Sequence, residues 1–156
     1  MGISLVFLAA GAFAQAQPTI DGIEARLFNS KTGNFSENIL AAGSPELGNV
    51  PSGEFASVST FIIVKVAFGP KAAKPANATV RLAASEGPTQ PFASKQARKP
   101  LLNAVSKLGP VDADGNTYVG FWLNSTGCRS VQLKVTLTAF GKTATAAETL
   151  PFACYE

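Results

Sequence analysis

The sequence predicts an all-β fold, an antiparallel β-sandwich built from short strands. Three observations support this prediction. Several segments alternate between apolar and polar residues, turn-forming residues separate them, and Val, Ala, Thr, Ser, Gly and Pro dominate the composition. Charged residues make up 15% of the chain and hydrophobic residues 46%, which is typical of a folded domain rather than a disordered chain.

The clearest strand is Val131–Ala139, where every odd position is apolar and every even position is polar. This period of two indicates that one face lies in the core and the other in solvent. Ser57–Phe68 is apolar on both faces, because Phe61 and Ile63 alternate with the main apolar series. We therefore expect Ser57–Phe68 to be a central strand.

Alternation also predicts strands at Ala78–Ala84 and Thr143–Cys154, and weaker alternation predicts strands at Ile23–Phe28 and Thr117–Leu123. Asn34–Leu40 is expected to be a further short strand or an irregular edge. Leu101–Leu108 fits a helix, with Pro100 at its first position, or a strand. We favour the strand because the rest of the chain reads as β.

Turn-forming residues occupy the segments Asn29–Gly33, Gly43–Gly53, Gly69–Asn77 and Asp112–Asn116. Short strands at this spacing are typical of a β-sandwich of the immunoglobulin-like kind. The resemblance concerns architecture only, since no family motif accompanies it.

The C-terminal hairpin allows a register to be predicted. A two-residue turn at Gly141–Lys142 pairs Leu137 with Ala146 and places Cys154 opposite Arg129. Because side chains alternate, Cys128 then faces the wrong side unless one residue bulges near Arg129 or Ser130.

We therefore expect a Cys128–Cys154 disulfide near the C-terminus together with that bulge. The closed loop would contribute about 3 kcal/mol to stability. Trp122, six residues before Cys128, is expected to be the core partner of the bridge.

Residues 1–16 have the pattern of a secretory signal peptide, and residues 17–156 that of a single β-sandwich domain. Ile3–Ala14 is apolar and is followed by the small residue Ala16, although Met1–Gly2 lacks the usual cation. The apolar run is shorter than the ~20 residues that a membrane-spanning helix needs. We expect a secreted, periplasmic or extracellular protein without a transmembrane span in the mature chain.

The sequence contains no histidine. Catalytic triads that need an imidazole base, and metal or haem sites that need an imidazole ligand, are therefore excluded. We expect a noncatalytic protein without a cofactor, with a carboxylate-dependent or calcium-dependent enzyme as the remote alternative.

Asp112, Asp114 and Asn116 place oxygen ligands at alternate positions, as the opening of a calcium loop does. The position that would hold the bidentate Glu of such a loop is Leu123. Asp114–Gly115 is also an ordinary signal for a tight turn, and we favour the turn over the metal site.

Residues 65–107 contain eight of the 13 cations and a single carboxylate, Glu86. A basic face there would suit a protein partner, an anionic glycan or a lipid surface. Its candidate contact residues are Lys71, Lys74, Lys95, Arg98, Lys99 and Lys107. Nucleic acid is not expected, because aromatic residues are scarce near these cations.

Three sequons, at Asn34, Asn77 and Asn124, are candidate glycosylation sites if the protein passes through a eukaryotic secretory pathway.

The function expected from these features is an exported, noncatalytic β-sandwich that serves as a structural or binding module of the cell envelope or extracellular space. It would bind a protein partner or itself, as a subunit of a larger assembly. The alternative is a soluble secreted domain that binds a glycan or inhibits a protein.

Overall fold

The computed structural model describes residues 17–44, 47–48, 59–70, 76–87, 99–124, 126–127 and 129–153. All regular elements in these ranges are strands. In chain order they are β1 (Thr19–Leu27), β2 (Leu47–Gly48), β3 (Ser59–Ala67), β4 (Thr79–Glu86), β5 (Pro100–Lys107), β6 (Asn116–Asn124), β7 (Val131–Ala139), β8 (Lys142–Leu150) and β9 (Phe152–Ala153). The predicted signal peptide and both cysteines lie outside the described residues.

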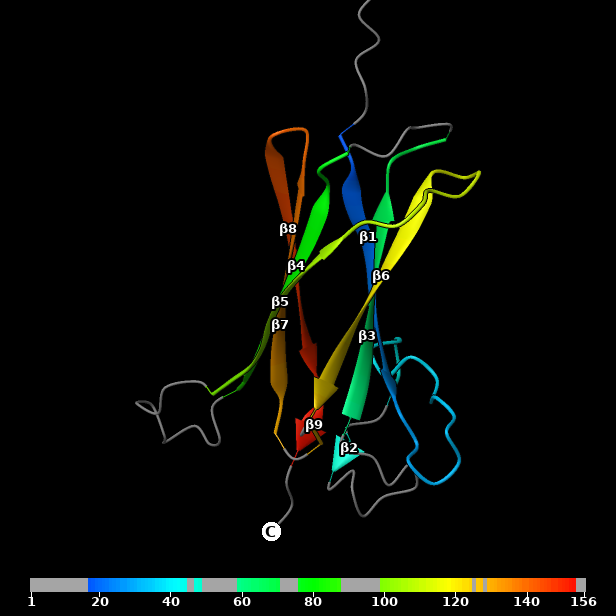
Figure 1. Cartoon of the computed structure of the whole chain (residues 1–156). Helices are drawn as coiled ribbons and strands as arrows, with labels where there is room; N and C mark the ends of the chain where they lie inside the picture. Colours follow the sequence, from blue (N-terminus) through cyan, green and yellow to red (C-terminus); the bar gives the residue numbers. More distant parts are fainter. Residues whose placement is uncertain are drawn as a thin grey trace, which may run out of the picture.

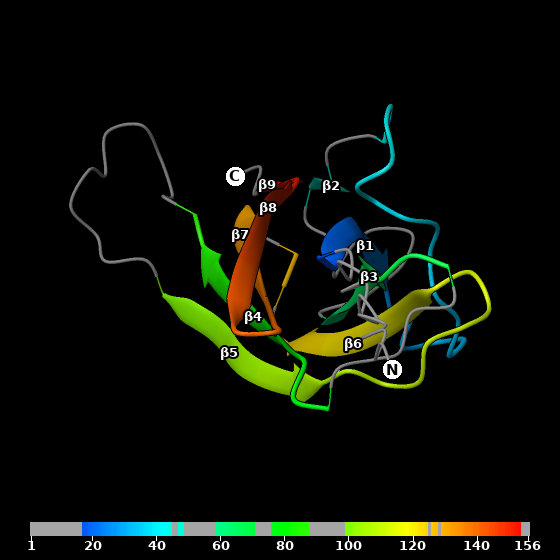
Figure 2. The same cartoon turned by 90° about the horizontal axis from the view of Figure 1, so that it is seen from above.

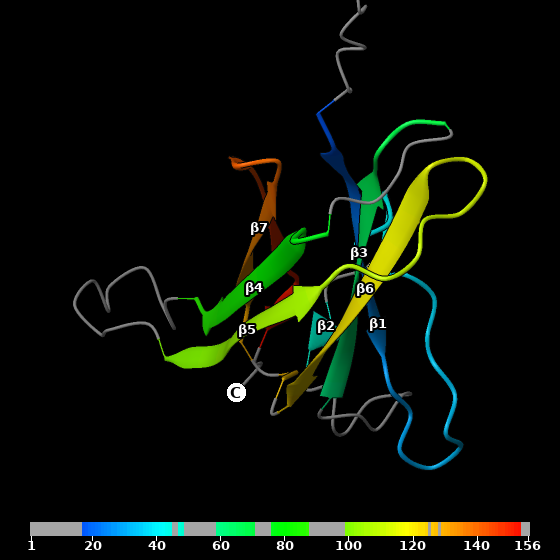
Figure 3. The same cartoon turned by 45° about the horizontal axis from the view of Figure 1, so that its top comes forward.

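The strands form a sandwich of two antiparallel sheets (Figure 1). The three-stranded sheet has the order β1-β3-β6, and the four-stranded sheet has the order β5-β4-β7-β8. The two sheets form separate layers when the molecule is seen from above (Figure 2). At the flanks, β1 contacts β8 and β5 contacts β6, where the end of β5 approaches β6 in Figure 3.

The core lies between the inner faces of the two sheets. The fully buried side chains of the three-stranded sheet include Ile62 and Val64, and those of the four-stranded sheet include Leu82, Leu133 and Val135. Burying a side chain of this size contributes about 1.5–3 kcal/mol. The alternation predicted for Val131–Ala139 is confirmed, because its odd positions are buried and its even positions are not.

The prediction that the Ser57–Phe68 segment supplies a central strand is confirmed, because β3 lies between β1 and β6. Leu101–Leu108 corresponds to β5, so the strand interpretation is correct. The strands predicted at Ile23–Phe28, Ala78–Ala84 and Thr117–Leu123 are also present, with bounds shifted by a few residues.

The Asn34–Leu40 segment is the irregular edge rather than a strand. The backbone amide of Ile39 donates to the carbonyl of Ala25 at 2.8 Å, and the side-chain oxygen of Asn38 accepts from the Ala25 amide at 2.9 Å. Ser36 Oγ accepts from the Leu27 amide at 2.9 Å. These side chains cover the open edge of β1, which limits its pairing with other chains.

The register predicted for the C-terminal hairpin is wrong by two residues. The turn is Phe140–Gly141, so Ala139 pairs with Lys142 and Leu137 pairs with Ala144. Phe140 has φ +52° and Gly141 φ +72°, as the two-residue turns that match strand twist require. A two-residue slip keeps every side chain on its own face, so the alternation could not detect it.

The predicted strand Thr143–Cys154 is in fact two strands. Pro151 lacks a backbone amide and ends the β7–β8 ladder at the pair Val131–Leu150. β9 then pairs with β2 in parallel. The bulge expected near Arg129 is therefore not part of this ladder, whereas the Cys128–Cys154 disulfide lies outside the described residues and stays a prediction.

Among the described residues, no helix meets the length and hydropathy that crossing a bilayer requires.

Candidate binding surface

Aromatic side chains gather on the outer face of the three-stranded sheet. In β6 the odd positions from Thr117 to Leu123 are buried, so Tyr118 and Trp122 point away from the core. Phe61 of β3 is paired directly with Trp122. The expectation that Trp122 packs in the core beside a disulfide is therefore wrong, because the parity of β6 turns its side chain outward.

Four of the rings form a compact cluster. The centroid of the Trp122 ring lies 5.3 Å from that of Phe28 and 5.6 Å from that of Phe61. Phe35 completes the cluster, 5.6 Å from both Phe28 and Phe61. The tilted and edge-to-face arrangements are those that aromatic pairs prefer, and each such pair contributes about 0.5–1.5 kcal/mol.

We call the five residues Phe28, Phe35, Phe61, Tyr118 and Trp122 the aromatic patch. Its rings remain open to solvent, with Tyr118 56%, Phe35 46% and Trp122 38% exposed. These are three of the five large hydrophobic residues that are exposed in the described part of the chain. Tyr, Trp and Phe are enriched at interaction sites, so this face is a candidate contact surface.

Gly120 lies in the middle of the patch. It lies between Tyr118 and Trp122 on the outward face of β6, and a Cβ atom at this position would overlap the Phe61 ring. The Phe61 ring therefore lies over the bare backbone of Gly120. Since alternate residues of a strand are ~7 Å apart, Tyr118 and Trp122 lie on the same face of β6, with the Phe61 ring over the position between them.

The loop that presents Phe35 is held by its own hydrogen bonds. Asn29 N donates to the carbonyl of Asn34 at 2.8 Å, and the amide of Gly33 donates to the carbonyl of Asn29 at 2.8 Å. The side chain of Asn29 also accepts from the amides of Lys31 and Thr32. The turn predicted at Asn29–Gly33 is thus confirmed, and it positions Phe35 over the sheet.

The charged groups beside the patch are paired with one another. Lys65 Nζ lies 2.6 Å from Asp21 Oδ2, and Arg26 Nη2 lies 2.9 Å from Glu24 Oε2. The hydrogen bond to Asp21 raises the pKa of Lys65 above its ordinary value of 10.5. These two ion pairs, two cations with two carboxylates, therefore carry no net charge.

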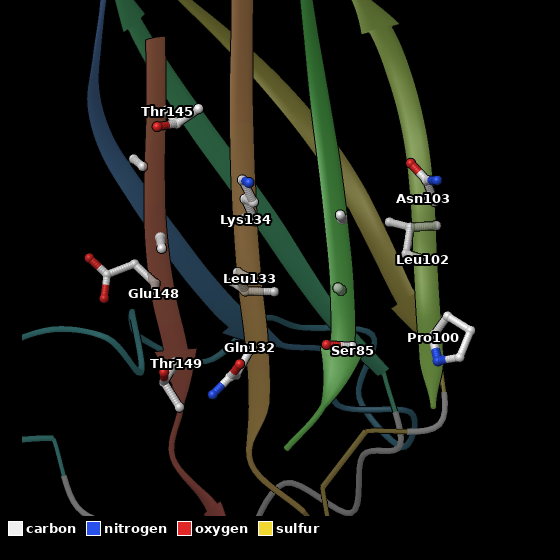
Figure 4. A pocket seen from close by; sticks show the side chains of 14 residues that line it. Ser85, Pro100, Leu102, Asn103, Gln132, Leu133, Lys134, Thr145, Glu148 and Thr149 are labelled. Carbon is white, nitrogen blue, oxygen red and sulfur yellow. The ribbon is translucent and has the colours of Figure 1, made fainter. Parts of the chain in front are cut away.

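The outer face of the four-stranded sheet differs in kind. It contains an open groove of about 970 Å³, which crosses all four strands. Figure 4 shows polar side chains from different strands along the groove, among them Asn103, Gln132, Lys134 and Thr145. Small residues such as Ala147 leave the strand backbones uncovered, which explains the hollow.

The predicted calcium ligands form a turn. Asp112 Oδ1 accepts from the backbone amides of Asp114 at 3.0 Å and Asn116 at 2.8 Å. The Gly115 amide donates to the Asp112 carbonyl at 3.1 Å. This is the tight turn favoured from the sequence, and its carboxylate stabilises the chain reversal into β6. In the described ranges, no three acidic or cysteine side chains are grouped as metal ligands would be.

The candidate basic face is only partly described. Lys71, Lys74, Lys95 and Arg98 lie outside the described residues. Lys99 and Lys107 are exposed, but they flank β5 at opposite ends, roughly 27 Å apart for a strand of this length. The structure therefore does not bring these two cations together.

The three sequon asparagines, Asn34, Asn77 and Asn124, are all exposed. Asn34 directly precedes Phe35 in the chain. Asn124 pairs with Ser59, two residues along the strands from the Phe61–Trp122 pair and on the same face of the sheet. Two of the three sequons therefore border the aromatic patch.

Sequence reasoning missed the aromatic patch, although two signals pointed to it. Phe61 and Ile63 made the second face of Ser57–Phe68 apolar, and Tyr118 and Trp122 occupy the outward positions of Thr117–Leu123. Aromatic residues at positions that alternation assigns to solvent favour a contact surface over a core.

Comparisons with protein-family models, with curated proteins and with solved structures find no match to this chain. Any function must therefore be argued from the two outer faces of the sandwich.

Proposed function

We propose that this protein is an exported, noncatalytic binding module of the cell envelope or extracellular space, and that the aromatic patch is its contact surface. The single observation that carries the proposal is the exposure of clustered Trp, Tyr and Phe rings on a sheet face. Tyr, Trp and Phe are enriched in protein contact surfaces, and a few such residues supply most of the binding energy.

The strand order supports an immunoglobulin-like topology for the module. Without the two-residue strands β2 and β9, the first, second and fifth strands form one sheet, and the fourth, third, sixth and seventh form the other. Immunoglobulin-like sandwiches also group A with B and E, and C with F and G. The fourth strand departs from the constant-type arrangement, because it lies beside the third strand rather than beside the fifth. Such domains bind through faces and loops, which suits an aromatic contact surface.

Export and the absence of catalysis are proposed from the sequence. The first 16 residues have the apolar run and small terminal residues of a secretory leader. The chain has no histidine for general acid–base or metal chemistry. These features favour a role in contact rather than in chemistry, either alone or as a subunit of a larger assembly.

The test is retention of native extracellular and envelope material on immobilised protein. Wild type should retain a defined protein or carbohydrate fraction that Trp122→Ala fails to retain. Phe140→Ala is the matched control, because Phe140 is as exposed as Phe35 but lies in the β7–β8 turn, away from the patch.

The proposal is overturned if both substitutions leave retention unchanged, or if no fraction binds wild type above an unrelated β-sandwich. Circular dichroism of each variant checks that a loss of retention does not come from unfolding.

A further inference from the structure

We infer that the occupant of the aromatic patch is an uncharged glycan. This inference rests on the proposed function and adds the chemistry of the ligand. Three properties of the patch lead to it: its rings, its charge balance and its size.

The rings suit a sugar. A pyranose has faces of C–H groups that pack on aromatic rings, and hydroxyl groups around its rim that need hydrogen-bond partners. Tyr118, Phe61 and Trp122, which share the outward face of β3 and β6, supply the rings. Ser59, Asn124 and the hydroxyl of Tyr118 supply neutral polar groups at its borders.

The charge balance favours an uncharged ligand. Asp21 and Lys65 neutralise each other, as do Glu24 and Arg26, through the ion pairs beside the patch. A polyanion would have to break these pairs to gain a cation, and it would bring a like charge towards the carboxylates. These two pairs therefore offer no net attraction to acidic or basic partners.

The size favours a small ligand over a second copy or a protein. The three strands are about 14 Å across, and Tyr118 and Trp122 are four residues apart, again about 14 Å. This gives a footprint on the order of 200 Å², well below the ~800 Å² that each partner buries in a stable protein interface. A few sugar units cover such an area.

The test uses the fact that Trp122 is the only tryptophan of the chain. Its fluorescence reports directly on the patch in the wild-type protein. We expect a saturable emission change on titration with a neutral oligosaccharide from a panel of cello-, xylo-, manno- and malto-oligosaccharides. Oligogalacturonate, the charged member of the panel, should give a much weaker response.

Tyr118→Ser is the discriminating variant, because Tyr118 lies outside the four-ring cluster and its loss leaves that packing intact. It should weaken the association constant about tenfold, as expected for loss of one aromatic contact. Phe140→Ala, at the β7–β8 turn, should leave the titration unchanged.

Two results would overturn the inference. If no neutral oligosaccharide changes the emission, while retention of native material still depends on Trp122, the patch binds a protein and only the glycan assignment fails. If sedimentation shows a dimer at micromolar concentration that Tyr118→Ser dissociates, the occupant is a second copy. Failure of the proposed function itself would appear instead as Trp122-independent retention.

Discussion

The two sheets of this sandwich share one core but present opposite surfaces to solvent. The outer face of the three-stranded sheet carries aromatic rings packed over Gly120, whereas that of the four-stranded sheet carries threonine, alanine and amide side chains. Core packing explains the inner faces of both sheets equally well. The difference between the outer faces therefore requires another cause, and binding is the one we propose.

The inner faces also differ in polarity, since the three-stranded sheet buries Thr60 and Thr117. Thr60 and Thr126 are buried against the three-stranded sheet with their hydroxyls 2.7 Å apart, whereas the buried residues of the four-stranded sheet are apolar. A pair of hydroxyls is tolerated in a core because one donates its hydrogen bond to the other.

The largest expected effect separates two glycines that both have positive φ. Gly115 has φ +86°, and a Cβ there would overlap the backbone of Gly69, while Gly141 has φ +72° in open space. Gly115→Ala should lower the free energy of unfolding by about 3 kcal/mol or more, and Gly141→Ala by about 1–2 kcal/mol. Urea denaturation measures both.

Equal losses of unfolding free energy in the two variants would show that close contact between Gly115 and Gly69 does not fix the turn that precedes β6. The position of the aromatic patch would then depend on other contacts.

The polar contact of the inner face can be tested by a double-mutant cycle. Thr60→Val leaves the Thr126 hydroxyl buried without its partner and should cost about 1–3 kcal/mol. Thr60→Val combined with Thr126→Val should recover most of this loss, because both polar groups are then removed. Additive losses in the urea midpoints would contradict this pairing.

The outer faces are compared most directly by truncation. Trp122→Ala should lower the free energy of unfolding by about 1–2 kcal/mol through lost ring contacts, and it should abolish retention of native material. Thr145→Ala, in the groove of the other sheet, should change neither property. A loss of retention in Thr145→Ala would move the binding surface to the groove.

A stabilising change is expected at the β7–β8 turn. Phe140 is the only non-glycine residue with positive φ in the described ranges, and it precedes Gly141. Phe140→Asn creates the Asn-Gly pair that this turn type prefers and should raise the free energy of unfolding by about 1 kcal/mol. A lower melting temperature would show that the Phe140 side chain stabilises the turn.

The smallest effect concerns the Asp21–Lys65 ion pair. The folded-state pKa of Lys65 is raised, so its contribution to stability is complete below pH 10.5 and is lost as the pH rises through the higher folded value. Asp21→Asn should remove this dependence, so the stability difference between wild type and variant should shrink above pH 10.5. A constant difference would contradict the pairing.

Alternation predicted the strands because a half-buried sheet imposes a period of two on the sequence. Alternation could not distinguish two hairpin registers that differ by two residues, because both keep the same side chains on the same face. The turn at Phe140–Gly141 rather than Gly141–Lys142 slips the ladder by two residues and changes no face. Pro151 does have a signature in the sequence: proline lacks the amide that a central ladder needs, which predicts that β8 ends at Leu150.

The aromatic patch was harder to predict, for a physical reason. A strand apolar on both faces, such as β3, is expected when it is buried on both sides or when one side binds a partner. Its central place in the sheet was predicted correctly, but Phe61 faces solvent-exposed rings rather than a second layer. Only the pairing of Phe61 with Trp122, 61 residues apart in sequence, brings the patch together.

The central claim, that the aromatic face rather than the groove makes contact, is tested most directly by photocrosslinking in the native environment. A benzophenone side chain is introduced at Tyr118 in one variant and at Thr145 in another, since both positions face solvent on opposite sheets. Abundant adducts from position 118, with few from position 145, are the predicted result. Adducts mainly from position 145, or none from position 118, would contradict the assignment of the aromatic patch as the binding surface.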